Sequence, residues 1–141
     1  MEKINFNLTQ DDDGYPPVSV ESLWARKKED FYVIDNIPFF TVDVAFGDLV
    51  KAKPDMDGNL WFAGLIESSA HSLIRVVFLD LKKKDWVIEK LKSLGCATEK
   101  MDDFNLLAVD VSEKIDRILV LEFLKEGLSL GYLDYEEAII R

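Results

Sequence analysis

Few residues in this chain are suited to catalytic or metal chemistry. Its 141 residues include one cysteine, Cys96, and one histidine, His71. A single cysteine forms no internal disulfide, which is typical of a reducing compartment, and one Cys with one His does not make a zinc site. The seven glycines form neither GxGxxG nor GxxxxGK, so no phosphate-binding loop is expected. We therefore predict neither a metal site nor a cofactor.

Long apolar segments are also missing. Met1 to Asn5 does not resemble a signal peptide or a membrane anchor, and the longest apolar run, Leu73 to Leu79, contains Arg75. Runs of this length are too short to cross a bilayer. We predict a cytoplasmic protein that has no membrane partner.

Basic residues are scarce relative to acidic ones. The chain has 27 acidic and 17 basic residues, a formal net charge of -10. Residues 1–69 hold 13 acidic and 6 basic residues, a net of -7, and residues 70–141 hold 14 and 11, a net of -3. A negative field repels nucleic acid and attracts cationic proteins, so we predict a basic protein partner and no nucleic acid. Simple solubility is the other explanation for such a composition.

A dense apolar run from Tyr32 to Phe40 organises the N-terminal half. Because Pro38 has no N–H to offer to a sheet, this run predicts two strands joined by a tight bend. Residues 18–26 fit either a strand or a short helical turn. Apolar alternation predicts strands over residues 4–8, 31–34, 40–46, 49–52 and 60–66. Together they predict a small bent antiparallel β-sheet or half-barrel.

The C-terminal half has a different pattern of apolar residues, which predicts helices as well as strands. We predict strands at 73–79, 96–101 and 104–111, an edge strand at 132–140, and helices at 86–94 and from 113 to about 130. Asp85 and Ser112 are the predicted helix caps, and Gly127 should weaken the second helix by about 1 kcal/mol relative to alanine. The order βαββαβ is that of ferredoxin-like folds. We predict an α+β fold whose subdomains, 1–69 and 70–141, pack as one body.

Two polar side chains stand out without forming a catalytic motif. His71 lies near several serines, yet the chain has no GxSxG elbow and no glycine-rich oxyanion loop. Cys96 follows a predicted turn and should pack as a small apolar residue rather than act as a nucleophile. Arg75, inside an apolar strand, should pair with an acid or reach a sheet edge rather than anchor a substrate. We predict that the protein is not an enzyme.

Five short segments carry a family resemblance: Asn36 to Phe39, Gly47-Asp48, His71 to Arg75, Leu94 to Cys96 and Ala108 to Val111. They resemble a small bacterial family described as a domain of unknown function, over nearly the whole chain. The resemblance implies a bacterial cytoplasmic protein and brings no catalytic residues. In size and charge the chain is also similar to immunity proteins, which protect bacteria from the toxin domains of their neighbours.

These observations favour a non-enzymatic acidic binding protein, most specifically an immunity protein that neutralises a basic, nuclease-type toxin domain. Its carboxylates would take the place of phosphates in a cationic site. The predicted partner-binding residues are Asp11, Asp12, Asp13, Asp55, Asp57, Asp134, Glu136 and Glu137. We expect a monomer or a weak homodimer. The alternative is a small-ligand-sensing or regulatory ferredoxin-like protein that binds a metabolite at its sheet edge.

Overall fold

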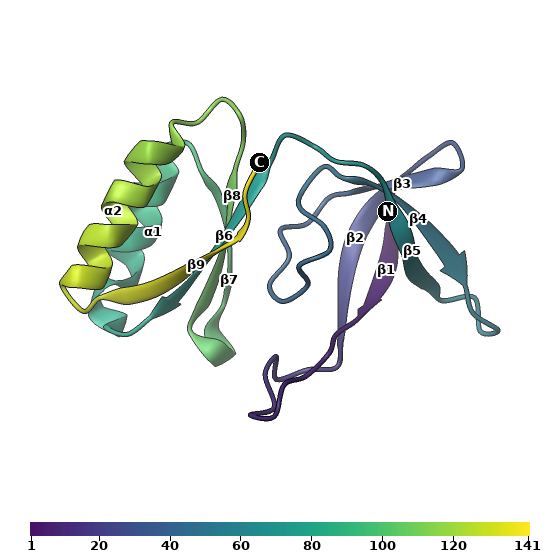
Figure 1. Ribbon diagram of the computed structural model, residues 1–141, viewed down its shortest axis with the longest axis horizontal. Coiled ribbons are helices and arrows are strands. Elements are labelled where there is room, and N and C mark those ends of the chain that lie inside the picture. Colours follow the sequence, from purple (N-terminus) through teal and green to yellow (C-terminus); the bar gives the residue numbers. More distant parts are fainter. The chain divides into compact units, whose positions relative to one another are not determined.

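The structure, a computed structural model, describes residues 1–141 and divides into two compact units, Met1–Ser69 and Ala70–Arg141 (Figure 1). The first unit is built of strands, and the second combines a sheet with two α-helices. The predicted α+β fold is confirmed. Neither α-helix has the length and apolar character needed to cross a membrane.

The first unit is a closed five-stranded barrel. Its strands follow one another around the barrel in chain order: β1 (Glu2–Asn7), β2 (Val20–Lys28), β3 (Phe31–Ile34), β4 (Leu49–Pro54) and β5 (Leu60–Glu67). Successive strands are antiparallel, and a short parallel pairing between β1 and β5 closes the barrel. The predicted bent sheet is therefore fully closed, which removes its free edges.

Inward-facing residues of the strands fill the barrel. Leu23 and Ala25 of β2 are buried while Trp24 between them is exposed. This period of two shows that residues 20–26 form a strand rather than a helical turn. The rings of Phe6 and Phe62 stack at a centroid distance of 4.8 Å inside the barrel. Val44 joins this core from the connection between β3 and β4.

The predicted strand over residues 40–46 is wrong. Residues 35–48 form an irregular loop between β3 and β4. Val44 is completely buried whereas Val42 is 64% exposed, so the alternating apolar residues do not share one face. Phe40 and Val44 are buried, but buried carboxylates, rather than a neighbouring strand, bind several of the loop's N–H groups.

The second unit is a four-stranded antiparallel sheet, in the order β7-β8-β6-β9, with both helices on one face (Figure 1). Its elements are β6 (Ser72–Phe78), α1 (Lys84–Ser93), β7 (Ala97–Met101), β8 (Leu106–Val111), α2 (Arg117–Ser129) and β9 (Leu133–Ile139), with 3₁₀ turns at Leu81–Lys83 and Asp102–Phe104. This is the predicted ferredoxin-like arrangement. The last strand lies at a sheet edge, as its charged sequence indicated.

Both helices begin away from their predicted caps. Asp80 caps the 3₁₀ turn that leads into α1 and accepts the N–H of Lys82 at 3.0 Å, so Asp85 lies inside the first helical turn. Asp116, rather than Ser112, caps α2 and accepts the N–H of Ile118 at 3.1 Å. Aspartate and serine are about equally good caps, so cap preference alone does not favour Ser112 over Asp116.

Gly127 in α2 has a packing role that helix propensity does not reveal. A Cβ at this position would lie 2.8 Å from the side chain of Leu133, which is completely buried at the start of β9. Glycine therefore allows α2 to approach the sheet closely. The core around this contact lies between the sheet and the helices and includes Leu107, Val109, Val120 and Leu124.

Candidate functional site

Two turns of the barrel share one sequence pattern, Asp-x-Asp-Gly, at residues 11–14 and 55–58. In the first turn, the Asp11 carboxylate accepts the N–H groups of Asp13 and Tyr15, both at 2.9 Å. Gly14 supplies the left-handed conformation, with φ of 77°, that closes the turn. The Asp11 side chain therefore stabilises its own turn by hydrogen bonds to the backbone.

The second turn repeats this network with Asp55. Its carboxylate accepts the N–H groups of Asp57 and Asn59, both at 2.9 Å, and also the indole N–H of Trp61 at 3.0 Å. These bonds, the Trp61 bond above all, lower the pKa of Asp55. Two of the predicted partner-binding residues, Asp11 and Asp55, thus have a structural role in the turns.

The two turns lie at opposite ends of the barrel. Because successive strands are antiparallel, the β1–β2 and β3–β4 loops share one end, and the β2–β3 and β4–β5 turns share the other. Tyr15 and Phe40 make a ring contact at 6.2 Å within the first end. Gly58 lines a pocket together with Lys3, which places the second turn beside the start of β1. The predicted acidic residues of the barrel therefore form two separate surfaces.

The basic residues of the first unit are confined to one part of the barrel. No Lys or Arg occurs in residues 4–25, 29–50 or 54–69. The six bases lie at the start of β1, at the end of β2 and in β4: Lys3, Arg26, Lys27, Lys28, Lys51 and Lys53. The end formed by the loops of residues 8–19 and 35–48 contains none of them. We call it the base-free end.

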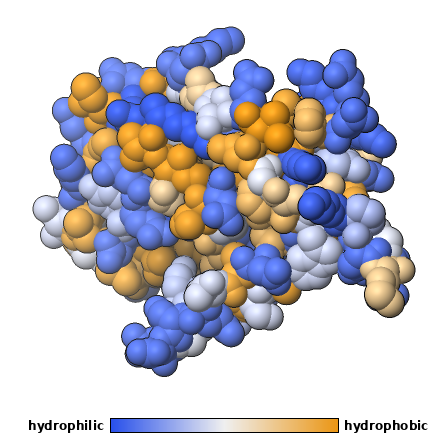
Figure 2. Space-filling model, turned by 45° about the vertical axis from the view of Figure 1, so that its right-hand side comes forward, coloured by the Kyte–Doolittle hydropathy of each residue, from blue (hydrophilic) through white to orange (hydrophobic).

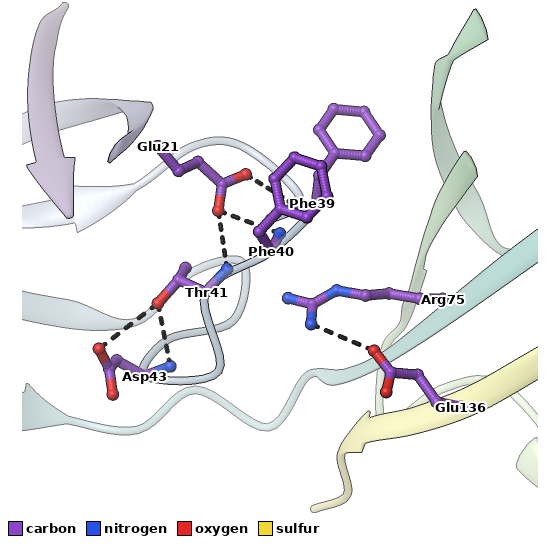
Figure 3. Close-up of polar contacts among 7 residues, drawn as sticks. All are labelled: Glu21, Phe39, Phe40, Thr41, Asp43, Arg75 and Glu136. Carbon is purple, nitrogen blue, oxygen red and sulfur yellow. Dashed lines mark hydrogen bonds and ion pairs between the residues drawn. The ribbon is translucent and has the colours of Figure 1, made fainter. Parts of the chain in front are cut away.

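A buried carboxylate holds the 35–48 loop of the base-free end. Glu21, 8% exposed at the start of β2, accepts the N–H groups of Phe39, Phe40 and Thr41 at 2.7, 3.1 and 2.8 Å (Figure 3). The Thr41 hydroxyl accepts the N–H of Asp43 at 3.2 Å, which fixes the next turn of the loop. These bonds attach the middle of the loop to β2.

A second buried carboxylate fixes the end of the same loop. Asp48 accepts the N–H of Ala45 at 2.9 Å and that of Ser69 at 2.8 Å. The Ser69 hydroxyl donates to the carbonyl of Phe46 at 2.6 Å. The loop is therefore attached by hydrogen bonds both to β2 and to the segment after β5.

The base-free end carries exposed carboxylates and exposed apolar side chains. Asp12, Asp13 and Asp43 are exposed, and no hydrogen bond or ion pair of the Asp12 and Asp13 carboxylates is found. Tyr15 and Val42 of the same two loops are 51% and 64% exposed. No three His, Cys, Asp or Glu side chains of the chain form a group that could hold a metal ion. The arrangement is suited to contact with a cationic surface that carries a small apolar area.

The remaining predicted acidic residues belong to β9 in the second unit. Glu136 forms an ion pair with Arg75 at 3.3 Å (Figure 3), and the buried Arg75 is thus paired with an acid, as predicted. Asp134 accepts the N–H of Tyr135 at 2.8 Å. Glu137 is exposed. Strand β9 therefore leaves fewer carboxylate oxygens for a partner than its sequence indicates.

His71 pairs with Asp110 in the second unit. Its Nδ1 lies 2.9 Å from both carboxylate oxygens of Asp110, which is 7% exposed. Burial raises the pKa of Asp110 despite the opposing effect of the His71 bond.

Cys96 lies in the core between the sheet and the helices. Burial, with a smaller contribution from Asp110, raises the pKa of its thiol to about 11. A thiol with that pKa is a poor nucleophile near neutral pH.

A groove of about 450 Å³ lies beside edge strand β7. Ile88 and Leu107 form its apolar part, and Lys92, Thr98 and Lys100 are among its polar lining residues. The groove lies at the sheet edge where the alternative prediction puts a bound metabolite, and that alternative stays a prediction.

Tyr15, Val42 and Asp43 were not singled out by the sequence analysis. The signal that locates them is the absence of Lys and Arg from residues 4–25 and 29–50, combined with the meander that brings these segments to one end. The net charge of residues 1–69 as a whole does not show that their Lys and Arg residues are confined to one part of the barrel.

Comparison with known proteins gives a family and a fold. No match was found among curated proteins. The chain is similar to a solved structure described as "Novel crystal structure of a hypothetical protein from Neisseria gonorrhoeae", with 24% sequence identity and a TM-score of 0.78, covering 99% of this chain and 96% of that one. This similarity supports the fold alone. A family model described as "Domain of unknown function (DUF4265)" matches residues 21–135, and the chain belongs to that family.

Proposed function

We propose that the chain is a non-enzymatic binding protein for a cationic protein partner and that the base-free end of the barrel is its contact surface. The observation that carries this proposal is the separation of charge within the first unit. All six bases lie outside the loops that hold Asp12, Asp13 and Asp43. A field of one sign at one end steers a cationic partner to that end and orients it.

The side chains of the base-free end support binding as well as steering. Carboxylates form charge-assisted hydrogen bonds with Lys and Arg of a partner. Tyr15 and Val42 supply exposed apolar area on the same loops, and tyrosine is frequent among the residues that dominate interface energies. The bonds from Glu21 and Asp48 hold the loop in one shape, which reduces the entropy lost on binding.

We propose further that the partner is a nuclease-type toxin domain and that the chain acts as its immunity protein. A nuclease binds phosphates through Lys and Arg, and the carboxylates of Asp12, Asp13 and Asp43 have the charge to occupy such a site. In this arrangement the chain blocks substrate access without catalysing a reaction. Inhibition of the nuclease activity by an equimolar amount of the intact chain is the expected result.

An NMR titration of the intact chain with a short Lys/Arg-rich peptide tests the contact surface. We expect the largest shift changes at the amides of Asp12, Asp13, Val42 and Asp43, and small changes near Asp57 at the opposite end. Binding should weaken as salt increases because the contact is electrostatic. Equal shift changes at both ends of the barrel would reject the base-free end as the specific surface.

A further inference from the structure

The outward-facing positions of the barrel strands are basic, although the chain as a whole is acidic. Side chains along a strand point alternately into and out of the barrel, and the burial patterns of β1 to β4 separate the two sets. The outward set of these four strands contains no acid and five exposed basic residues: Lys3, Arg26, Lys28, Lys51 and Lys53. We call these five residues the basic face. The prediction of no nucleic-acid partner rests on net charge, which does not describe this face.

Two tryptophans lie beside the basic face, on the strands that flank β1. Trp24 of β2 pairs with Lys3, and Trp61 of β5 pairs with Asn5, so both tryptophans share the outer side of the barrel with these residues. Lys3 Nζ lies 5.0 Å from the centre of the Trp24 ring. Hydrophobic and hydrophilic residues are interspersed on the side of the molecule drawn in Figure 2, so exposed apolar area alone does not mark a site. The combination of an indole that is 43% exposed with an adjacent ammonium group is more specific.

A pocket of about 430 Å³ adjoins Lys3 and is lined mainly by polar side chains. Lysine ammonium, asparagine amide and tyrosine hydroxyl groups all donate hydrogen bonds to a phosphate oxygen. No ion pair of either lysine in the lining is found. The donors of the lining are Lys3, Lys27, Asn5, Asn59 and Tyr32, and its single carboxylate is that of Glu2.

Acidic residues border the basic face at the ends of its strands. They are Glu29 and Asp30 between β2 and β3, Asp35 after β3, Asp55 and Asp57 between β4 and β5, and Glu67 at the end of β5. The Asp55 carboxylate is already bonded to the indole N–H of Trp61 at 3.0 Å. A broad anionic surface, such as a duplex or a membrane, would meet these acids as well as the basic residues. A single strand is narrow enough to follow the basic residues alone.

We propose that the basic face and the adjoining pocket bind a short single strand of nucleic acid. A phosphate lies in the pocket beside Lys3 and Lys27, and an unpaired nucleobase stacks on the indole of Trp24. Every nucleobase has a face that stacks in this way, so affinity depends on the presence of unpaired nucleobases rather than on their sequence. A duplex keeps its nucleobases within the stack, and an acidic peptide has carboxylates but no nucleobase. Neither of them uses both parts of the site.

Fluorescence anisotropy of a labelled oligothymidylate of about ten nucleotides, titrated with the intact chain at low salt, tests the site. We expect saturable binding whose dissociation constant rises with salt, because phosphate contacts release counterions. Trp24→Ala should weaken binding at least about fivefold, and Trp24→Phe should restore most of the loss because a phenyl ring still offers a stacking face. Lys3→Glu should weaken binding at least about tenfold. The matched controls are Trp86→Ala and Lys125→Glu at exposed positions of the second unit, and both should bind as the wild-type chain does.

Three kinds of result would overturn the proposal. The first is a wild-type chain that does not bind the oligothymidylate at low salt. The second is equal weakening by Lys3→Glu and Lys125→Glu, or no weakening by Trp24→Ala, because charge alone would then explain binding. The third is binding of a duplex of the same length, an oligoglutamate peptide or anionic vesicles as tightly as the single strand, since these lack unpaired nucleobases. Circular dichroism of each variant confirms that the comparison is made between folded proteins.

Discussion

Removing the Glu21 carboxylate should release the 35–48 loop. In Glu21→Ala, the N–H groups of Phe39, Phe40 and Thr41 lose their acceptor. An unsatisfied buried donor costs about 1–3 kcal/mol, and Phe40 and Thr41 are buried while Phe39 is half-buried. Two full penalties and part of a third together predict a loss of about 2–7 kcal/mol in the stability of this loop.

Native-state hydrogen exchange measures this loss directly. The amides of Phe39, Phe40 and Thr41 should lose protection in Glu21→Ala, whereas those of the second unit should keep it. Glu67→Ala is the control, because Glu67 is an exposed carboxylate in the same barrel. Protection lost by less than about 1 kcal/mol would show that water or another group satisfies the three donors, and the reasoning about the loop would be refuted.

Three further predictions concern the second unit. Gly127→Ala gains about 1 kcal/mol of helix propensity but forces a contact with Leu133, so urea unfolding should show a net loss of about 1 kcal/mol. Cys96, whose pKa is raised to about 11, should react with iodoacetamide near neutral pH only after unfolding. Because burial raises the pKa of Asp110, the folded state keeps a proton that the unfolded state releases, so stability should fall as pH rises from about 4 through the raised pKa. Unfolding at several pH values should show that Asp110→Asn removes this decline.

Periodicity was sufficient to predict most of the fold. The near-continuous apolar run of β6 and the apolar sequence of β8 correspond to strands that are buried along nearly their whole length. The order of strands and helices along the chain then indicates the ferredoxin-like sheet. Helix starts were less certain because Asp80 and Asp116 compete with other good caps nearby. Local sequence shows which residues are able to cap a helix, but the tertiary structure decides which one does.

The 35–48 loop shows why alternation alone is insufficient. Phe40 and Val44 are buried as they would be in a strand, yet Val42 between them is exposed. Three N–H groups in the middle of the loop are instead bound by Glu21, which is far from the loop in sequence. A bond between segments about 20 residues apart leaves no local pattern.

The candidate site was only partly predictable. An acidic N-terminal half was expected from composition, and Asp13 and Asp57 were among the predicted partner-binding residues. Their location at opposite ends depends on the strand pairing, which the sequence did not reveal. The roles of Asp11 and Asp55 within their own turns could be expected from the Asp-x-Asp-Gly spacing, since aspartate often bonds N–H groups two residues ahead.

Charge reversal at each end of the barrel tests most directly whether the base-free end is the binding surface. Asp12→Lys with Asp13→Lys changes that end, and Asp30→Lys with Asp57→Lys makes the same change in net charge at the other. With a short Lys/Arg-rich peptide at low salt, we expect the first variant to bind at least about tenfold more weakly than wild type, and the second to stay within about threefold. Equal weakening by both variants would contradict the account, because net charge alone would then explain binding.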